Sequence, residues 1–329
     1  MKIILTLLAC FAAMCLNAAE PLLLVTSKVE LSNVAGRIDH LSIDLKTKRL
    51  FIAALGNGSV EVVDLEKSTV IQSIKGFEEP QGLVFVPDVN KLFVACGGDG
   101  SVRVYDGTTL KEEKKIDLKS DADGVRYDAA TKRVYVGHES GAIAIIDPTS
   151  YEILADIKVS AHPEAFCVDA AAKRIYVNVP GSTTVEIIDL DAKKVTEVWK
   201  LKDGKNNFPM ALDTEHERLF VGCRSGAIIL AINTKTGENI NLLQSEQDLD
   251  DLFWDPKLGM LMAVGGGGSG MVQRQKLLRP DEYRILPEYF TRKGARTGLY
   301  VPEFHSIFVA VPKSGKKPAE VWEIQMSDK

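Results

Sequence analysis

Acidic, imidazole and guanidinium side chains precede seven similar segments of this chain, and they are the first candidates for chemistry. The ten candidate ligand-binding residues are Asp39, His40, Gln81, Asp123, His162, Glu164, Asn207, Asp250, Asp251 and Arg296. The segments that follow repeat faithfully, whereas these positions differ from one copy to the next and remain polar. A packing role would favour the same small residue in every copy, so the variation predicts a binding site here.

Part of this set has the chemistry of a metal site. The candidate metal ligands are Asp39, Glu164, Asn207 and Asp250. Their oxygen atoms are hard ligands that suit Ca²⁺ or Mg²⁺, while the neighbouring His40 and His162 would favour a transition metal. A divalent cation is therefore the one candidate cofactor. The alternative is a solvated rim, in which the acidic residues accept hydrogen bonds from exposed amides and Arg296 offsets their charge.

Seven repeats must bring these residues together. The apolar residues that mark the copies are Leu50, Leu92, Val134, Ile175, Leu219, Met260 and Ile307. They are separated by 42, 42, 41, 44, 41 and 47 residues. A period of roughly 40–45 residues with several short strands per unit is typical of a β-propeller. One face of such a ring collects the segments that enter each first strand, so the candidate residues should converge at the mouth of the central channel.

The first repeat shows the four strands of one blade. Residues 41–44 alternate apolar and polar side chains, residues 49–54 suit a strand buried on both faces, and residues 60–64 and 70–74 complete the sheet. The third strand closes with Asp64, and an equivalent aspartate ends the third strand of later repeats. Such a side chain can accept hydrogen bonds from turn amides, which predicts a structural role.

The two ends of the chain predict how the ring closes. The last repeat stops after its third strand at residues 321–326, and residues 22–31 form one unmatched strand. The fold class is therefore all-β: a seven-bladed β-propeller with four antiparallel strands per blade, its ring closed by an N-terminal strand that completes the last blade. Closure of this kind hides two sheet edges that would otherwise favour aggregation.

Residues 1–19 are expected to be a secretory signal peptide, and residues 20–329 the propeller. A basic start, a short apolar stretch and small residues at the cleavage point support this reading, which predicts a secreted or periplasmic protein. Lipid attachment through Cys10 is the alternative. Two of the five cysteines fall within the signal, and the odd number that remains argues against a disulfide framework.

Composition narrows the choice of partners. The formal net charge is −5 and no basic stripe is present, so nucleic-acid binding is not expected. No segment after the signal is long and apolar enough for a membrane-spanning helix. The expected partner of this monomer is therefore a small molecule or an extracytoplasmic protein, neither of which the sequence identifies.

Short motifs within the repeats carry a resemblance to a known family. Tyr176-Val177-Asn178 and Tyr135-Val136-Gly137 follow a Pro-x-Gly segment such as Pro80-Gln81-Gly82. These motifs resemble the YVTN-type (YncE-like) seven-bladed propeller family over essentially the whole mature chain. The resemblance implies an extracytoplasmic protein, and some such relatives bind nucleic acid. The WD40 family is a poorer match, because the one Trp-Asp pair, Trp254-Asp255, lies in a first strand.

Two functional hypotheses of different class follow. The first is a noncatalytic binding or scaffolding module with a polar, acidic ligand site at the channel mouth. The second is a metal-dependent hydrolase, by analogy with gluconolactonase-type lactonases, which place a divalent ion at the strand starts of a propeller. There the ion would polarise a carbonyl group and a nearby carboxylate would act as general base. No residue is assigned a catalytic role.

Two further features lie outside the candidate site. His138 occupies a slot that is apolar or thiol-bearing in other repeats, and is expected to be a hydrogen-bonded spacer. The sixth repeat contains a glycine run at residues 265–268, and residues 274–280 are expected to break its turn between third and fourth strands. That repeat departs most from the others.

Overall fold

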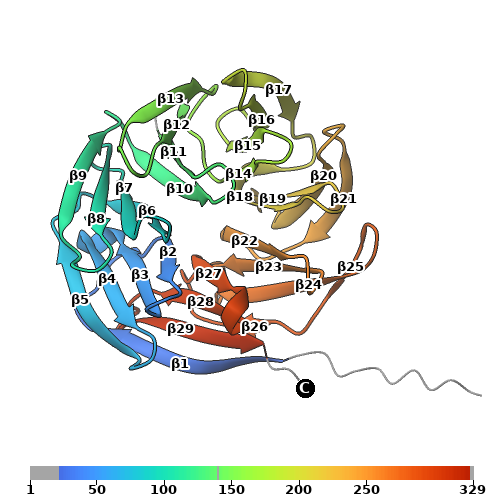
Figure 1. Cartoon of the computed structure of the whole chain (residues 1–329). Helices are drawn as coiled ribbons and strands as arrows, with labels where there is room; N and C mark the ends of the chain where they lie inside the picture. Colours follow the sequence, from blue (N-terminus) through green and yellow to red (C-terminus); the bar gives the residue numbers. More distant parts are fainter. Residues whose placement is uncertain (1–21, 139–140, 327–329) are drawn as a thin grey trace, which may run out of the picture.

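The computed structural model describes residues 22–138 and 141–326, and these residues form seven antiparallel sheets arranged in a ring (Figure 1). The sheets lie around a central axis, with the first strand of each blade innermost and the fourth outermost (Figure 1). The predicted seven-bladed propeller is confirmed. Apart from strands, the described residues contain two short 3₁₀ turns, η1 (Leu55–Asn57) and η2 (Pro302–Phe304).

The inner half of the ring consists of first and second strands. The first strands are β2 (Leu41–Asp44), β6 (Pro80–Val86), β10 (Ala122–Asp128), β14 (Phe166–Asp169), β18 (Lys205–Asp213), β22 (Leu249–Asp255) and β27 (Gly298–Val301). The second strands are β3 (Arg49–Ala54), β7 (Lys91–Cys96), β11 (Arg133–His138), β15 (Arg174–Val179), β19 (Arg218–Ser225), β23 (Met260–Gly265) and β28 (Ser306–Val311).

The outer half consists of third and fourth strands. The third strands are β4 (Ser59–Asp64), β8 (Ser101–Asp106), β12 (Ala142–Ile146), β16 (Thr184–Asp189), β20 (Ile228–Asn233), β24 (Met271–Arg279) and β29 (Ala319–Met326). The fourth strands are β5 (Thr69–Lys75), β9 (Glu112–Asp117), β13 (Ile153–Lys158), β17 (Lys194–Lys200), β21 (Asn239–Gln244), β25 (Glu282–Ile285) and β1 (Leu23–Leu31).

The ring closes as the chain ends predicted. β1 pairs antiparallel with β29, from Leu23 opposite Met326 to Leu31 opposite Ala319. The last blade therefore takes its first three strands from the end of the chain and its fourth from the beginning. This closure ties the first and last repeats together and covers the edge of β29.

Apolar contacts between neighbouring sheets form the core. The second strand β3 is buried along both faces, and Phe51 is fully inaccessible. The Phe51 ring stacks on Phe85 of the next blade with 5.8 Å between ring centroids. Each blade buries its faces against two neighbours in this way, so the seven similar units stabilise one another.

The repeated aspartates have the structural role that was predicted. The Asp106 carboxylate accepts hydrogen bonds from the backbone N–H groups of Thr108 and Thr109, at 3.1 and 2.8 Å. In the next blade Asp147 accepts from Thr149 and Ser150, at 2.9 and 3.1 Å. Each side chain satisfies amides of its own turn, which explains why the residue recurs where the third strand ends.

Blade six differs from the prediction at two points. Asp255 pairs with Met260 as Asp44 pairs with Arg49, so Met260 marks this repeat one residue too early and Leu261 is the true equivalent of Leu50.

The segment 274–280 does not interrupt the sheet of blade six. β24 continues to Arg279, turns back into β25, and also pairs with the short strand β26 (Tyr289–Phe290). Arg274 lies fully buried within β24 and donates to the Pro287 carbonyl oxygen at 3.2 Å. Blade six therefore differs from the other blades in its outer edge, where two short strands, β25 and β26, both pair with β24.

The predicted signal peptide, residues 1–19, and Cys10 lie outside the described residues. Within the described ranges, none of the helical segments is long and apolar enough to cross a bilayer. Cys96, Cys167 and Cys223 are free thiols, and burial raises the pKa of each to about 12. These thiols are protonated at neutral pH, as expected for small apolar filler.

Candidate functional site

The candidate residues lie at irregularities of the first strands. In β10 the register with β11 shifts between Ala122 and Val125, which places Asp123 and Gly124 outside the regular ladder. Equivalent shifts occur in β6, β18 and β22. A β-bulge of this kind bends the strand and can redirect a side chain. The bulges explain how polar residues reach the axis from strands whose remaining side chains pack between blades.

Blades one and four reach the same geometry just before their first strands begin. The Asp39 N–H donates to the Ala53 carbonyl at 2.7 Å, while the Ala53 N–H donates to the His40 carbonyl at 3.0 Å. Two residues thus oppose one across the ladder. Glu164 and Ala165 oppose Asn178 in the same manner, with N···O distances of 2.9 and 3.0 Å.

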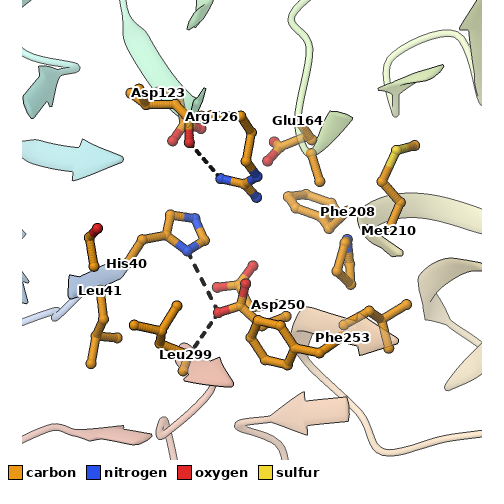
Figure 2. Close-up of a pocket in the computed structure, with 18 of the residues that line it drawn as sticks. His40, Leu41, Asp123, Arg126, Glu164, Phe208, Met210, Asp250, Phe253 and Leu299 are labelled. Atoms are coloured by element: carbon orange, nitrogen blue, oxygen red, sulfur yellow. Dashed lines mark hydrogen bonds and ion pairs between the residues drawn. The ribbon is translucent and has the colours of Figure 1, made fainter. Parts of the chain in front are cut away.

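A cavity of about 240 Å³ lies on the axis, and the first strand or its entry segment in all seven blades contributes to its wall. Figure 2 shows the charged groups of His40, Asp123, Arg126, Glu164 and Asp250 around this space. Apolar side chains, among them Phe208, Phe253 and Leu299, complete its wall. The cavity therefore combines an apolar wall with converging charges, which is the usual composition of a small-molecule site.

His40 lies between two carboxylates. Its Nδ1 atom is 3.6 Å from Asp251 Oδ2, and its Nε2 atom is 3.6 Å from Asp39 Oδ1. Burial alone would lower the pKa of His40, but the adjacent Asp251 carboxylate outweighs it and raises the pKa to about 10. The ring is therefore an imidazolium at neutral pH. Burial raises the pKa of Asp39, whose carboxylate is also bound by Arg37 at 2.7 Å.

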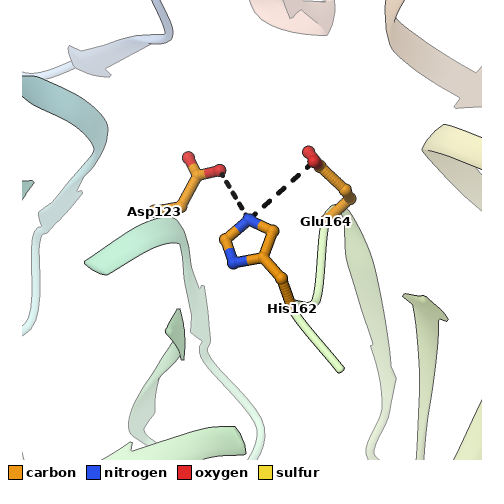
Figure 3. A group of neighbouring side chains, drawn as sticks. All are labelled: Asp123, His162 and Glu164. Carbon is orange, nitrogen blue, oxygen red and sulfur yellow. Dashed lines mark ion pairs between the residues drawn. The ribbon is translucent and has the colours of Figure 1, made fainter. Parts of the chain in front are cut away.

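Asp123, His162 and Glu164 form a compact group in blades three and four. The His162 Nε2 atom lies 3.7 Å from Asp123 Oδ2 and 3.8 Å from Glu164 Oε1, and Figure 3 shows it facing both carboxylates. Burial, together with the charge of Asp123, raises the pKa of Glu164 to about 7. Interaction with Asp123 raises the pKa of His162. The three ligand atoms lie within 4.8 Å of one another and could hold a metal ion.

Asp250 reaches the cavity from blade six and is held by two arginines. Arg224 bonds one carboxylate oxygen, and Arg296 Nε lies 2.9 Å from the other. Burial nevertheless raises the pKa of Asp250 to about 6. The Arg224 guanidinium also stacks on Phe208, with 3.7 Å between Cζ and the ring centroid. This stacking fixes the apolar wall beside the carboxylate.

The structure brings together half of the predicted ligand-binding residues at the cavity wall. The five that line it are His40, Asp123, Glu164, Asp250 and Asp251. Asp39, His162 and Arg296 do not line it but contact wall residues through the ion pairs above. Gln81 instead donates to Asp121 Oδ1 at 2.8 Å and does not line the cavity.

Asn207 is not placed as a ligand. It is fully buried between blades, where its amide donates to Asn178 Oδ1 at 3.0 Å and to the Thr184 carbonyl at 2.9 Å. The other three predicted metal ligands pair with different residues: Asp39 with Arg37, Glu164 with His162, and Asp250 with Arg296. The four predicted metal ligands therefore do not form one group, and the described residues that do are Asp123, His162 and Glu164.

Arg126 is the cavity residue that sequence reasoning missed. It lies in β10 opposite Tyr135, deeper along the strand than Asp123. The equivalent positions in the other blades hold Ser42, Val84, Cys167, Ala211, Phe253 and Leu299. A single arginine in a slot that is otherwise small or apolar was the available signal, but this slot lies within the strand and not at the strand entry, where the other candidate residues lie.

Comparisons with known proteins identify the fold and nothing finer. No protein-family model matches the chain, and no curated protein matches it in sequence. Among solved structures, a chain in the crystal structure of the mitotic checkpoint complex superimposes with a TM-score of 0.77. The two are 13% identical, and the match covers 99% of each chain. At this identity the likeness concerns architecture alone, and it agrees with the seven blades described above.

Proposed function

We propose that this chain is an extracytoplasmic binding or scaffolding propeller of the YVTN type, with its ligand site in the axial cavity. One observation carries the proposal: ionisable and apolar side chains of several blades converge on a space that all seven blades line. The structural repeat alone does not require such groups there. The YVTN motifs and the predicted signal peptide support the family and the location.

The test compares purified wild-type protein with the variant Glu164→Gln/Asp250→Asn, which removes two cavity charges while keeping side-chain size. Each protein is equilibrated with small molecules from a culture supernatant or periplasmic extract, washed, and analysed by mass spectrometry. We expect wild-type protein to retain a compound that the variant loses, and that compound to raise the wild-type melting temperature, because a ligand specific to the folded state stabilises it.

A matched control is Glu66→Gln/Asp191→Asn, which removes two exposed carboxylates, 65% and 70% accessible, far from the axis. It should retain the compound as wild type does. Equal retention by all three proteins would contradict an axial site. Signal cleavage is tested separately: N-terminal sequencing of the exported protein should begin at residue 20.

A divalent cation is the second candidate, and the Asp123–His162–Glu164 group is the observation that favours it. The 3.7 and 3.8 Å separations exceed normal hydrogen-bond lengths. They agree with two ligands that each lie about 2 Å from a shared ion. The mixed imidazole and carboxylate set suits a transition metal better than the Ca²⁺ or Mg²⁺ of the oxygen-only set.

Elemental analysis and melting with and without a chelator test this candidate. We expect one metal per chain, a lower melting temperature after chelation, and loss of the metal in His162→Gln. A chelator-insensitive melt without bound metal would rule it out, and with it the lactonase-like hydrolase, which needs an ion to polarise its carbonyl substrate.

A further inference from the structure

Arg126 is the cation of the cavity that other side chains leave available. Its guanidinium points toward the middle of the space (Figure 2), and Nη1 donates to the backbone carbonyl of Val125 at 2.8 Å. Within residues 22–138 and 141–326, Arg126 forms no ion pair with a carboxylate. The Phe166 ring centroid lies 5.9 Å from its Cζ atom. A planar guanidinium in this state presents donors that match a carboxylate.

His40 and Glu164, two other charged groups of the wall, do have ion-pair partners within the protein. His40 is already balanced by Asp39 and Asp251, each at 3.6 Å. Glu164 has His162 at 3.8 Å as its one ion-pair partner among the described residues. The cavity thus offers a guanidinium for an anionic group and, on the same side of the space in Figure 2, a carboxyl group for a cationic one.

The apolar wall and the size of the cavity limit the ligand further. Phe208 and Phe253 provide a surface for a short hydrocarbon segment. The volume of about 240 Å³ corresponds to roughly eight water molecules at about 30 Å³ each. A ligand of about that many non-hydrogen atoms fits, whereas a folded partner does not enter.

We propose that the axial cavity binds a small amphoteric carboxylate. Its carboxylate group pairs with Arg126, its ammonium group with Glu164, and its hydrocarbon segment packs on Phe208 and Phe253. This inference rests on the proposed binding function and specifies its ligand. A phosphate monoester fits less well, because its second negative charge would face the surrounding carboxylates with one guanidinium to balance it.

The experiment measures binding of four probes to the full chain by ligand-observed NMR, with a chelator present. The probes are 4-aminobutanoate, butanoate, butylamine and inorganic phosphate. We expect 4-aminobutanoate to bind at least tenfold more tightly than the other three, because it alone carries both charges. Equal affinity for the four probes, or no binding of 4-aminobutanoate, would overturn the proposal.

Variants assign the two contacts. Arg126→Met should weaken 4-aminobutanoate binding at least tenfold, and Glu164→Gln should remove its advantage over butanoate. Arg126→Lys keeps the charge but not the planar fork, so it should bind at an intermediate level and covers the case that the methionine variant folds poorly. The control Arg133→Met alters a half-exposed arginine outside the cavity, 3.3 Å from Asp147, and should bind as wild type does.

Retention of 4-aminobutanoate by folded Arg126→Met would also refute the assignment. Failure of this proposal remains distinguishable from failure of the proposed function. A compound that wild-type protein retains from extract and Glu164→Gln/Asp250→Asn loses would establish the axial site, even if that compound lacks a carboxylate.

Discussion

Asp106 and Glu164 carry the same carboxylate group, yet the protein shifts their pKa values in opposite directions. Hydrogen bonds from the turn, above all from the Thr109 backbone N–H, lower the pKa of Asp106. Burial and the charge of Asp123 raise the pKa of Glu164 to about 7. The turn supplies its aspartate with donors from the next few residues, whereas the axial carboxylates meet other charges across the channel.

This difference separates structural from ligand-binding acidic residues. A turn carboxylate is satisfied by its own repeat, so the same residue recurs from blade to blade. An axial carboxylate lies at a bulge with few donors of its own and depends on another blade or a ligand. Four variants examine this contrast, from the largest expected effect to the smallest.

Gly82→Ala should destabilise the protein most, because the axial region depends on close approach of the inner strands. A Cβ atom at Gly82 would lie 2.1 Å from the Asp123 carbonyl oxygen in the neighbouring blade. We expect unfolding in urea to show a loss of about 3 kcal/mol, as for severe overpacking. Gly124 holds the equivalent position one blade later, but its Cβ would come no closer than 3.5 Å to Phe166. A similar loss in Gly124→Ala would show that strand approach is not the cause.

Asp44→Ala should cost about 2 kcal/mol, because it removes several hydrogen bonds from one turn. The carboxylate accepts from the Lys46 N–H at 3.1 Å and from Arg49 at 3.1 Å, and it also bonds the Thr47 hydroxyl. Asp44→Asn keeps an acceptor oxygen and should lose about half as much. Equal melting temperatures of wild type and Asp44→Ala would show that the hydrogen bonds of this turn carboxylate do not stabilise the fold.

The stabilisation by Asp44 should also depend on pH. Burial tends to raise its pKa, but hydrogen bonds from Thr47 and Arg49 outweigh this and lower it below 3.8. Its contribution is therefore present above about pH 4 and lost as the pH falls through the folded-state pKa. The difference in unfolding free energy between wild type and Asp44→Ala should therefore narrow as the pH falls below 4, which acid unfolding measures.

Glu164→Gln/Asp250→Asn should produce a pH response of the opposite sign. The folded-state pKa values of about 7 and about 6 lie above the ordinary 4.5 and 3.8. These groups favour the folded state below pH 4, and that advantage is lost as the pH rises through 6 to 7. Melting of chelated wild type should decline over this interval more steeply than melting of the variant. Parallel curves of melting temperature against pH for the two proteins would contradict the raised pKa values of Glu164 and Asp250.

Lys173→Ala should change stability least and should melt at the same temperature as wild type. Lys173 lies 2.7 Å from Asp191, but the two side chains are 62% and 70% exposed. Water screens such a pair, so short distance alone does not make a carboxylate structural or functional. A clearly lower melting temperature for Lys173→Ala would mean that solvent exposure does not distinguish exposed, turn and axial carboxylates.

The sequence predicted the ring and its closure, and half of its ten candidate ligand-binding residues line the cavity, but it predicted individual contacts less well. Asn207 shares the polar character of its neighbours and yet bonds Asn178 between blades, because it precedes the bulge in β18. Arg126 was overlooked because its position on the inner strand is apolar or small elsewhere. In blade six the sequence placed Met260 one residue too early, because β23 begins with Met260 where most other second strands begin with Lys or Arg.

The sequence by itself determined the architecture of this protein, because strand periodicity and turn aspartates act over a few residues and recur in every copy. The pairing of β1 with β29 also follows from local pattern, since one end lacks the strand that the other supplies. Only the tertiary structure decided the chemistry at the axis. Whether Arg126, Glu164 and His40 meet depends on bulges that redirect side chains and on the distance across a closed ring. Those are relations among residues far apart in the chain, and no local pattern encodes them.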